Sequence, residues 1–331
     1  MSILALVVIT IAIALLFDFV NGFHDSANAI ATIVVTRVLT PHQAVVIAAL
    51  GNFIGAFLFP VAVATTVGKG IVDPNAVSEV VILAGLVGAV IWDLFTWLLG
   101  MPTSSSHALI GGLIGASLVA AGPSVVEWRG VLTTAEFIII APFLGMIGAM
   151  FFTIIVFFAV RNSRPGQVNS HFRKLQLLSS TFYAVSHGTN DAQKTMGVIA
   201  AVLVSTGYID HFYIPIWVIL SAHAAIASGT YFGGWRIVKT LGTKIKRLRP
   251  VDGFCAETGG GIVLLFTALS GIPVSTTHVI SGAIIGVGSV KNFSSVRWVV
   301  ARRIFWAWIL TIPASAIIAS IVFFIFRLFM H

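Results

Sequence analysis

Long hydrophobic stretches follow one another along almost the whole chain, and short polar stretches separate them. About 20 apolar residues are enough to cross a bilayer as an α-helix. We therefore expect helices over ten segments: 3–36, 43–68, 78–101, 103–121, 133–160, 176–205, 212–235, 254–271, 272–290 and 299–326. The pattern predicts an all-α polytopic membrane protein with about ten transmembrane or re-entrant segments.

Two of these segments are too long for one simple crossing. As a continuous helix, segment 3–36 would be about 50 Å long, whereas the hydrocarbon core is only about 30 Å thick. It contains Asn21-Gly22, and segment 176–205 contains Gly188 in a similar setting. Because glycine tolerates an unwound backbone, we expect both helices to be discontinuous at these points.

Composition supports the membrane interpretation and excludes other classes. Of the 331 residues, 58% are hydrophobic and 9% charged, whereas a soluble domain has about 25% charged residues. No basic segment precedes residues 2–17, so we do not expect a cleaved signal peptide. The single cysteine excludes an internal disulfide. The net charge of +8 lies mostly in short loops, which indicates a lipid bilayer and not nucleic acid as the partner.

Two polar motifs interrupt the apolar segments, and each occurs twice. The stretch 21–28 (NGFHDSAN) returns at 187–194 (HGTNDAQK), and 102–107 (PTSSSH) returns at 273–278 (PVSTTH). Ionisable groups at membrane depth are costly and usually functional. We therefore expect one transmembrane domain made of two repeats, 1–165 and 166–331, joined by a cytoplasmic linker at about 161–174.

The two repeats are expected to have opposite orientations in the membrane. Each contains five apolar segments, and an odd number returns the chain on the other side of the bilayer. Basic residues concentrate in 161–174, 236–249 and 291–303, which the positive-inside rule places in the cytoplasm. Both termini would then lie outside. If 103–121 or 272–290 is re-entrant, the number of crossings falls.

The first motif carries carboxylates and amides. We expect Asp25 and Asp191 to bind a coupling cation or a proton, with Asn28 and Asn190 as further oxygen donors. Glu257, before the second Ser/Thr run, is a third candidate for the coupling ion. The alternative is structural: each aspartate caps a helix or pairs with a basic residue.

The second motif favours anion binding. A proline fits the first turn of a helix, whose free N–H groups attract anions, and hydroxyls add donors without a permanent charge. A lone serine often only bonds its own helix, but runs of three in both halves are not explained that way. The candidate anion ligands are Thr103, Ser104, Ser105, Ser106, Ser275, Thr276 and Thr277.

Four histidines and one lysine complete the candidate site. His107 and His278 end the Ser/Thr runs, and each could be structural or a ligand. His24 and His187 flank the aspartate motifs and could support proton transfer. Lys194 stands where the first motif has an asparagine. A buried ammonium needs an anion, so we expect Lys194 to contact the substrate or to replace a bound cation.

Taken together, these motifs resemble the signatures of the PiT inorganic phosphate transporters. The resemblance rests on 17–29, 186–197 and the two Pro-x-Ser-[ST]-[ST]-His stretches, and it covers both halves. It implies phosphate uptake across the prokaryotic cytoplasmic membrane by symport with H⁺ or Na⁺, inverted repeats and a substrate near the midplane. The matching positions imply a coupling role for the Asp/Asn residues and a phosphate-facing role for 104–106 and 275–277.

The coupling ion is expected to be H⁺. His24 precedes Asp25, and Gln193-Lys194 replaces the pattern typical of sodium-coupled members, which looks like the bacterial low-affinity, proton-coupled branch. A fixed ammonium would also repel Na⁺. Na⁺ coupling and sulfate transport remain the alternatives within the family. The sequence leaves open whether a metal–phosphate complex is carried and whether the protein forms a homodimer.

Two other classes fit less well. An intramembrane aspartyl protease would leave the Ser/Thr runs without a role, and no Gly-x-Gly-Asp stretch is present. A passive anion channel would need no carboxylates at its anion site. We therefore expect a transporter, not an enzyme, with no cofactor and no resident metal.

Overall fold

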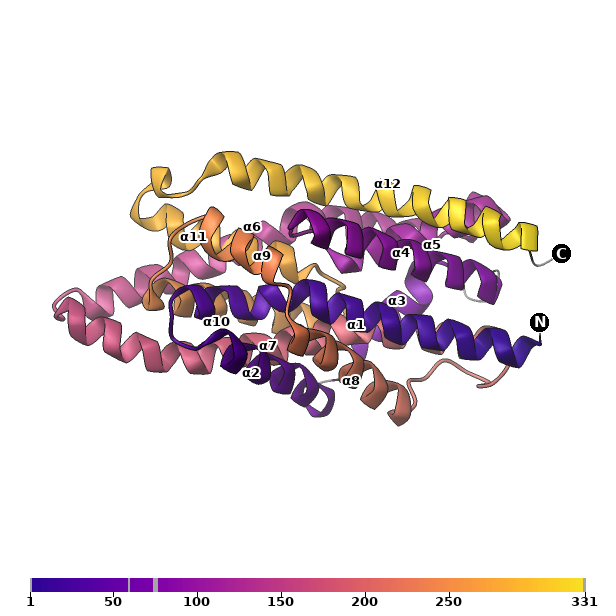
Figure 1. Cartoon of the computed structure of the whole chain (residues 1–331), viewed down its shortest axis with the longest axis horizontal. Helices are drawn as coiled ribbons and strands as arrows, with labels where there is room; N and C mark the ends of the chain where they lie inside the picture. Colours follow the sequence, from indigo (N-terminus) through magenta and orange to yellow (C-terminus); the bar gives the residue numbers. More distant parts are fainter. Residues whose placement is uncertain (1, 59, 74–76, 330–331) are drawn as a thin grey trace.

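The chain folds as a bundle of helices that run mostly along one long axis (Figure 1). The computed structural model describes residues 2–58, 60–73 and 77–329. In chain order, the helices of the described residues are α1 (Ile3–Val35), α2 (Pro41–Ile54), η1 (Gly55–Phe57), α3 (Ala62–Gly70), α4 (Glu79–Leu99), α5 (Ser105–Ala121), η2 (Pro123–Val125), α6 (Trp128–Val160), α7 (Pro165–Ser205), α8 (Ile216–Phe232), α9 (Trp235–Lys239), η3 (Thr240–Lys244), α10 (Pro250–Leu269), α11 (Thr276–Lys291), η4 (Phe293–Ser295) and α12 (Trp298–Phe329). The all-helical prediction is confirmed.

The ten expected transmembrane or re-entrant segments are not confirmed by the length and composition of the helices alone. Among the described residues, five helices are long and apolar enough to cross a membrane, namely α1, α4, α6, α10 and α12. Two bent pairs, α2–η1 with α3 and α8 with α9–η3, raise the number to seven if each pair is one span. α5 and α11 are shorter apolar helices. α7 has 41 residues, and its exposed polar start contains most of the stretch expected to be a linker.

The predicted breaks in the two long segments are wrong. α1 runs without interruption through Gly22, and α7 through Gly188. Their glycines serve helix packing instead. A Cβ on Gly22 would lie 2.1 Å from the carbonyl oxygen of Ile226, and one on Gly188 would lie 2.5 Å from the carbonyl oxygen of Asn52. Glycine therefore allows α8 to approach α1 and α2 to approach α7 at backbone contact.

The bends lie in the following segment of each half. α8 and α9–η3 meet at 61°, where Gly233 has a φ of 71° in the left-handed region that favours glycine. The α2–η1 and α3 axes differ by 82°. The sequence pattern did not distinguish these bends, because both segments read as continuous apolar runs.

The two Ser/Thr motifs lie at the tips of two helical hairpins, α4–α5 and α10–α11. Gly100 ends α4 with a φ of 64°, and Gly271 follows α10 with a φ of 69°. The helices then restart after the caps Ser104 and Ser275, whose side chains accept hydrogen bonds from the backbone N–H of the residue three positions later. The prolines of both motifs thus precede the cap, and the expectation that they occupy the first helical turn is wrong.

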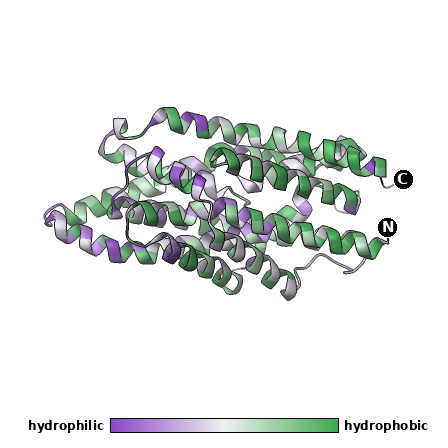
Figure 2. Ribbon diagram, in the orientation of Figure 1, coloured by the Kyte–Doolittle hydropathy of each residue, from purple (hydrophilic) through white to green (hydrophobic). Residues whose placement is uncertain are grey.

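Helices from the two halves of the chain pack against one another. α6 lies along α11, α5 along α12, and α1 along α8. Figure 1 places both termini at one end of the bundle and the α6–α7 connection at the other. Polar residues gather at the end with that connection, and apolar residues cover the helices towards the termini (Figure 2). The halves therefore form one interlocked domain, with the polar motifs inside it.

Candidate functional site

All four repeated motifs converge in the interior of the bundle. α1 and α7 supply the aspartate motifs, and the tips before α5 and α11 supply the Ser/Thr motifs. Every candidate side chain among them is buried, and none is more than 5% exposed. The motif side chains therefore lie inside the bundle, away from its surface.

Hydrogen bonds join the aspartate motif of the first half to the Ser/Thr motif of the second. The Asn28 amide nitrogen lies 2.9 Å from the Thr277 hydroxyl oxygen and 3.2 Å from that of Thr276. Thr277 donates to Asp25 at 3.3 Å, and Thr276 donates to Asp191 at 2.9 Å. Each of these two hydroxyls therefore contacts one of the carboxylates, so the groups expected to bind the anion and those expected to bind the cation are not spatially separate.

Lys194 bonds to both halves. Its ammonium forms an ion pair with Asp191 and donates hydrogen bonds to the Ser106 hydroxyl and, at 2.8 Å, to the Val274 carbonyl oxygen. A buried carboxylate with a bonded ammonium needs no further cation for charge balance. Lys194 therefore occupies the place on Asp191 where a bound cation could otherwise lie.

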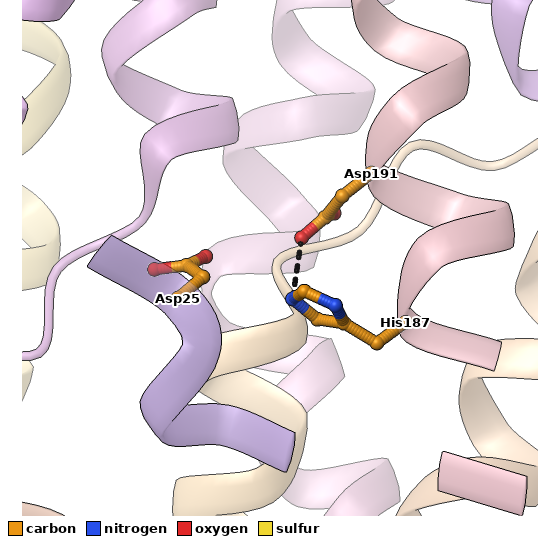
Figure 3. Close-up of side chains that lie close together, drawn as sticks. All are labelled: Asp25, His187 and Asp191. Atoms are coloured by element: carbon orange, nitrogen blue, oxygen red, sulfur yellow. Dashed lines mark ion pairs between the residues drawn. The ribbon is translucent and has the colours of Figure 1, made fainter. Parts of the chain in front are cut away.

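Two histidines flank the carboxylates. His24 Nδ1 lies 2.6 Å from Asp25 Oδ1, and its Nε2 lies 3.2 Å from the Thr96 hydroxyl. His187 Nε2 lies 3.1 Å from Asp191 Oδ2. Figure 3 shows Asp25 on α1 facing His187 and Asp191 on α7. One ligand atom from each of these three residues lies within 4.8 Å of the others, close enough to hold a single cation.

The remaining histidines pack against each other. The rings of His107 and His278 meet edge to face with centroids 4.8 Å apart, and His278 stacks on Trp308 at 4.0 Å. These contacts favour the structural reading of both residues. They also bring the starts of α5 and α11 together, so two positive helix ends share one site.

Some polar atoms at the site are left for a ligand. Among the described residues, the amide oxygen of Asn28 and both amide atoms of Asn190 have no hydrogen-bond partner, although each is buried. Buried polar groups are nearly always paired, so such atoms require an explanation. Asn28 and Asn190 belong to the aspartate motifs, and their free amide atoms suit a transient ligand.

Glu257 lies in a separate polar cluster. It accepts hydrogen bonds from Thr32 at 2.6 Å, from Gln176 at 2.9 Å and from Ser179. Thr32 is seven residues beyond Asp25, about 10 Å along a helix at 1.5 Å per residue. The structure therefore does not bring Glu257 into the Asp25–Asp191 cluster, and within the described part of the chain its side-chain hydrogen bonds go to Thr32, Gln176 and Ser179 instead.

Sequence reasoning missed several polar neighbours of the site. Asn52 contacts His187 Nδ1 at 3.1 Å, Thr96 contacts His24, and the Tyr183 hydroxyl donates to the Thr276 carbonyl at 3.1 Å. Tyr183 lies one helical turn before His187, a spacing that could have indicated it. Asn52 and Thr96 belong to neither repeated motif, and only their tertiary contacts reveal them.

Comparisons with known proteins agree on the family. Residues 21–319 match the model of the phosphate transporter family. A "probable low-affinity inorganic phosphate transporter" of Rhizobium meliloti is 53% identical and covers 95% of this chain and 94% of its own. One of the same name from Bacillus subtilis is 41% identical and covers 99% of each. A solved structure titled "The sodium-dependent phosphate transporter" matches with a TM-score of 0.87, 27% identity and coverage of 98% and 99%.

Proposed function

The chain belongs to the phosphate transporter family, a family of multi-pass membrane proteins, and on that premise we propose that it imports inorganic phosphate by symport with protons. The observation that carries this proposal is that candidate phosphate ligands form hydrogen bonds with the candidate ligands of the coupling ion. Thr276 and Thr277, candidate phosphate ligands, donate to the two carboxylates that would take the coupling ion. Neutralising those carboxylates releases the hydroxyls towards an anion.

The charges favour joint binding of an anion and a cation. Two helix starts lie beside Lys194 and carry the hydroxyls of Ser105, Ser106, Thr276 and Thr277. These hydroxyls, the free N–H groups of the helix starts and the ammonium together offer hydrogen-bond donors to a phosphate. Two aspartates stand next to this donor set, and phosphate would be repelled while both are charged. Because Lys194 already pairs with Asp191, a proton or cation at Asp25 removes the remaining repulsion, so phosphate binding depends on the coupling ion.

Protons fit this site better than sodium. Lys194 already neutralises Asp191, and His24 contacts Asp25, so a Na⁺ ion would compete with an ammonium and lie beside an imidazole. Na⁺ prefers oxygen ligands, whereas a histidine next to a carboxylate can pass a proton. Na⁺ coupling is the second candidate, since the similar solved structure is titled sodium-dependent.

We further propose that residues 1–165 and 166–331 are inverted repeats. The order of elements supports this: each half has a long helix, a bent pair, a helical hairpin, a 3₁₀ turn and a long proline-containing helix. Pro142 and Pro313, and likewise Gly100 and Gly271, are 171 residues apart (313 − 142 and 271 − 100). Inverted repeats around a central site permit alternating access, with the basic loops in the cytoplasm.

Transport into proteoliposomes tests this function. We expect labelled phosphate to accumulate above equilibrium under an imposed proton gradient and an ionophore to abolish the accumulation. Unlabelled arsenate should compete with phosphate, and sulfate should not, because sulfate has no proton to donate to a carboxylate. Passive equilibration alone would indicate a channel. Competition by sulfate with no effect of arsenate would indicate a sulfate permease.

A further inference from the structure

A large groove opens on the surface between α6, α11 and α12. Its volume is about 810 Å³, and its walls are almost entirely apolar, with Phe143 and Met146 from α6, Ile285 from α11, and Val299 and Phe305 from α12. The groove faces outwards, since Phe143 is 53% and Val299 62% exposed. In a membrane protein such a surface faces hydrocarbon, so an acyl chain is the occupant that its walls suit.

One end of the groove carries positive charge. Arg302 lines it and is exposed, and Arg297 and Arg303 lie near it in the same basic segment. In the described part of the chain, no carboxylate forms an ion pair with any of these three arginines. An unpaired guanidinium beside an apolar groove is complementary to a phosphodiester with an attached acyl chain.

Aromatic side chains at the same end of the groove indicate that this end lies at the membrane interface. Trp298 lines the groove, stacks on Phe293 with centroids 4.3 Å apart, and donates its indole N–H to the Phe293 carbonyl at 3.0 Å. Tryptophans are enriched where lipid headgroups meet hydrocarbon. Arg302 is therefore at headgroup depth, with the apolar part of the groove extending from it into the bilayer.

We propose that this groove binds an anionic phospholipid, with its phosphate on Arg302 and an acyl chain along α6 and α11. The inner wall connects the lipid to the transport site. Trp308 lines the groove, donates its indole N–H to the Pro102 carbonyl at 3.0 Å, and stacks on His278. The acyl chain thus supports a ring that contacts the Ser/Thr motifs of both halves.

Lipid binding to the delipidated, full-length protein tests this proposal independently of transport. Native mass spectrometry would compare phosphatidylglycerol with phosphatidylcholine of identical acyl chains. We expect about a fivefold preference for phosphatidylglycerol, as one basic contact near a membrane surface provides. R302Q should remove the preference. R303Q, which removes the same charge from a neighbour that does not line the groove, should keep it.

A second variant addresses the acyl chain. Ala301 lines the groove and is partly exposed, so A301F fills it without disturbing the core. We expect A301F to reduce the binding of both lipids at least fivefold. Equal loss of preference in R302Q and R303Q would overturn the proposal in favour of a diffuse basic surface. Loss of a dimer in A301F, with lipid binding unchanged, would identify a second copy of this chain as the occupant.

Discussion

At the scale of single residues, the sequence alone identified the charged groups of the site but not the contacts between them. The motifs identified Asp25, Asp191 and Lys194 as exceptional because they are ionisable within apolar helices. They did not reveal that Lys194 bonds to Asp191 and to Ser106 of the other half. Pairing across about 90 residues of sequence depends on the packing of the helices. The clearest residue-scale predictions concern these charges.

Removing the carboxylates should uncouple transport. In D25N or D191N, the amide keeps the shape of the side chain but cannot take a proton, so gradient-driven phosphate uptake should fall at least tenfold. E136Q is the matched control, because Glu136 is exposed on α6 and belongs to no motif. Unchanged gradient-driven uptake in both aspartate variants would refute the coupling role of the carboxylates.

Replacing the buried lysine should change the ion that drives uptake. K194N introduces the residue that α1 has at the corresponding position, Asn28, and frees Asp191 from its ammonium. Sodium should then stimulate phosphate uptake at constant pH, where it has no effect on the parent protein. K194R keeps the charge and should remain insensitive to sodium. A folded K194N protein that ignores sodium would argue against the role of Lys194 as a built-in cation.

At the scale of helices, hydrophobic length predicted where the elements lie but not how they bend. The expected segment 299–326 and the observed helix Trp298–Phe329 agree closely, because the apolar run defines the length of helix that can lie in a bilayer. The glycines of the aspartate motifs led to the wrong prediction that α1 and α7 are discontinuous. A glycine that permits unwinding and one that permits close packing look the same in sequence, and only the facing backbone distinguishes them.

The packing role of Gly22 has a measurable consequence. G22A places a methyl group against the Ile226 carbonyl and forces α1 away from α8, with an expected cost of about 1–3 kcal/mol. The thermal unfolding temperature in detergent should fall. G166A is the control, since no other group lies within 4 Å of that position in α7. An unchanged unfolding temperature in G22A would contradict tight contact between these helices.

The hairpin tips are held by a threonine from the opposite half. Thr66 donates to the Gly271 carbonyl at 2.7 Å, and Thr240 donates to the Gly100 carbonyl at 2.8 Å. If the repeats are inverted, each bond closes one face of the site. T66V should therefore increase labelling of V274C, in a background with Cys255 replaced by serine, by an impermeant thiol reagent added outside.

T240V is the matched control in the same labelling experiment. It removes an equivalent hydroxyl, but from the hairpin tip that would face the cytoplasm, so labelling of V274C from outside should stay low. Equal labelling in T66V and T240V would show that the two bonds do not close separate faces.

At the scale of the whole molecule, the internal duplication was the clearest prediction from the sequence. Shared spacing between motifs predicted two equivalent halves, and the element order repeats accordingly. How those halves interlock was beyond the sequence, because α6 pairs with α11 and α5 with α12 across the boundary between them. The convergence of all four motifs in one buried site is a product of that packing.

The most direct test of the central claim measures phosphate uptake into proteoliposomes while the pH and sodium gradients are varied independently. A protein whose site couples phosphate to Asp25 and Asp191 through protons should accumulate phosphate under a pH gradient without sodium. It should show no response to a sodium gradient at constant pH. Uptake that follows the sodium gradient and ignores the pH gradient would contradict proton coupling.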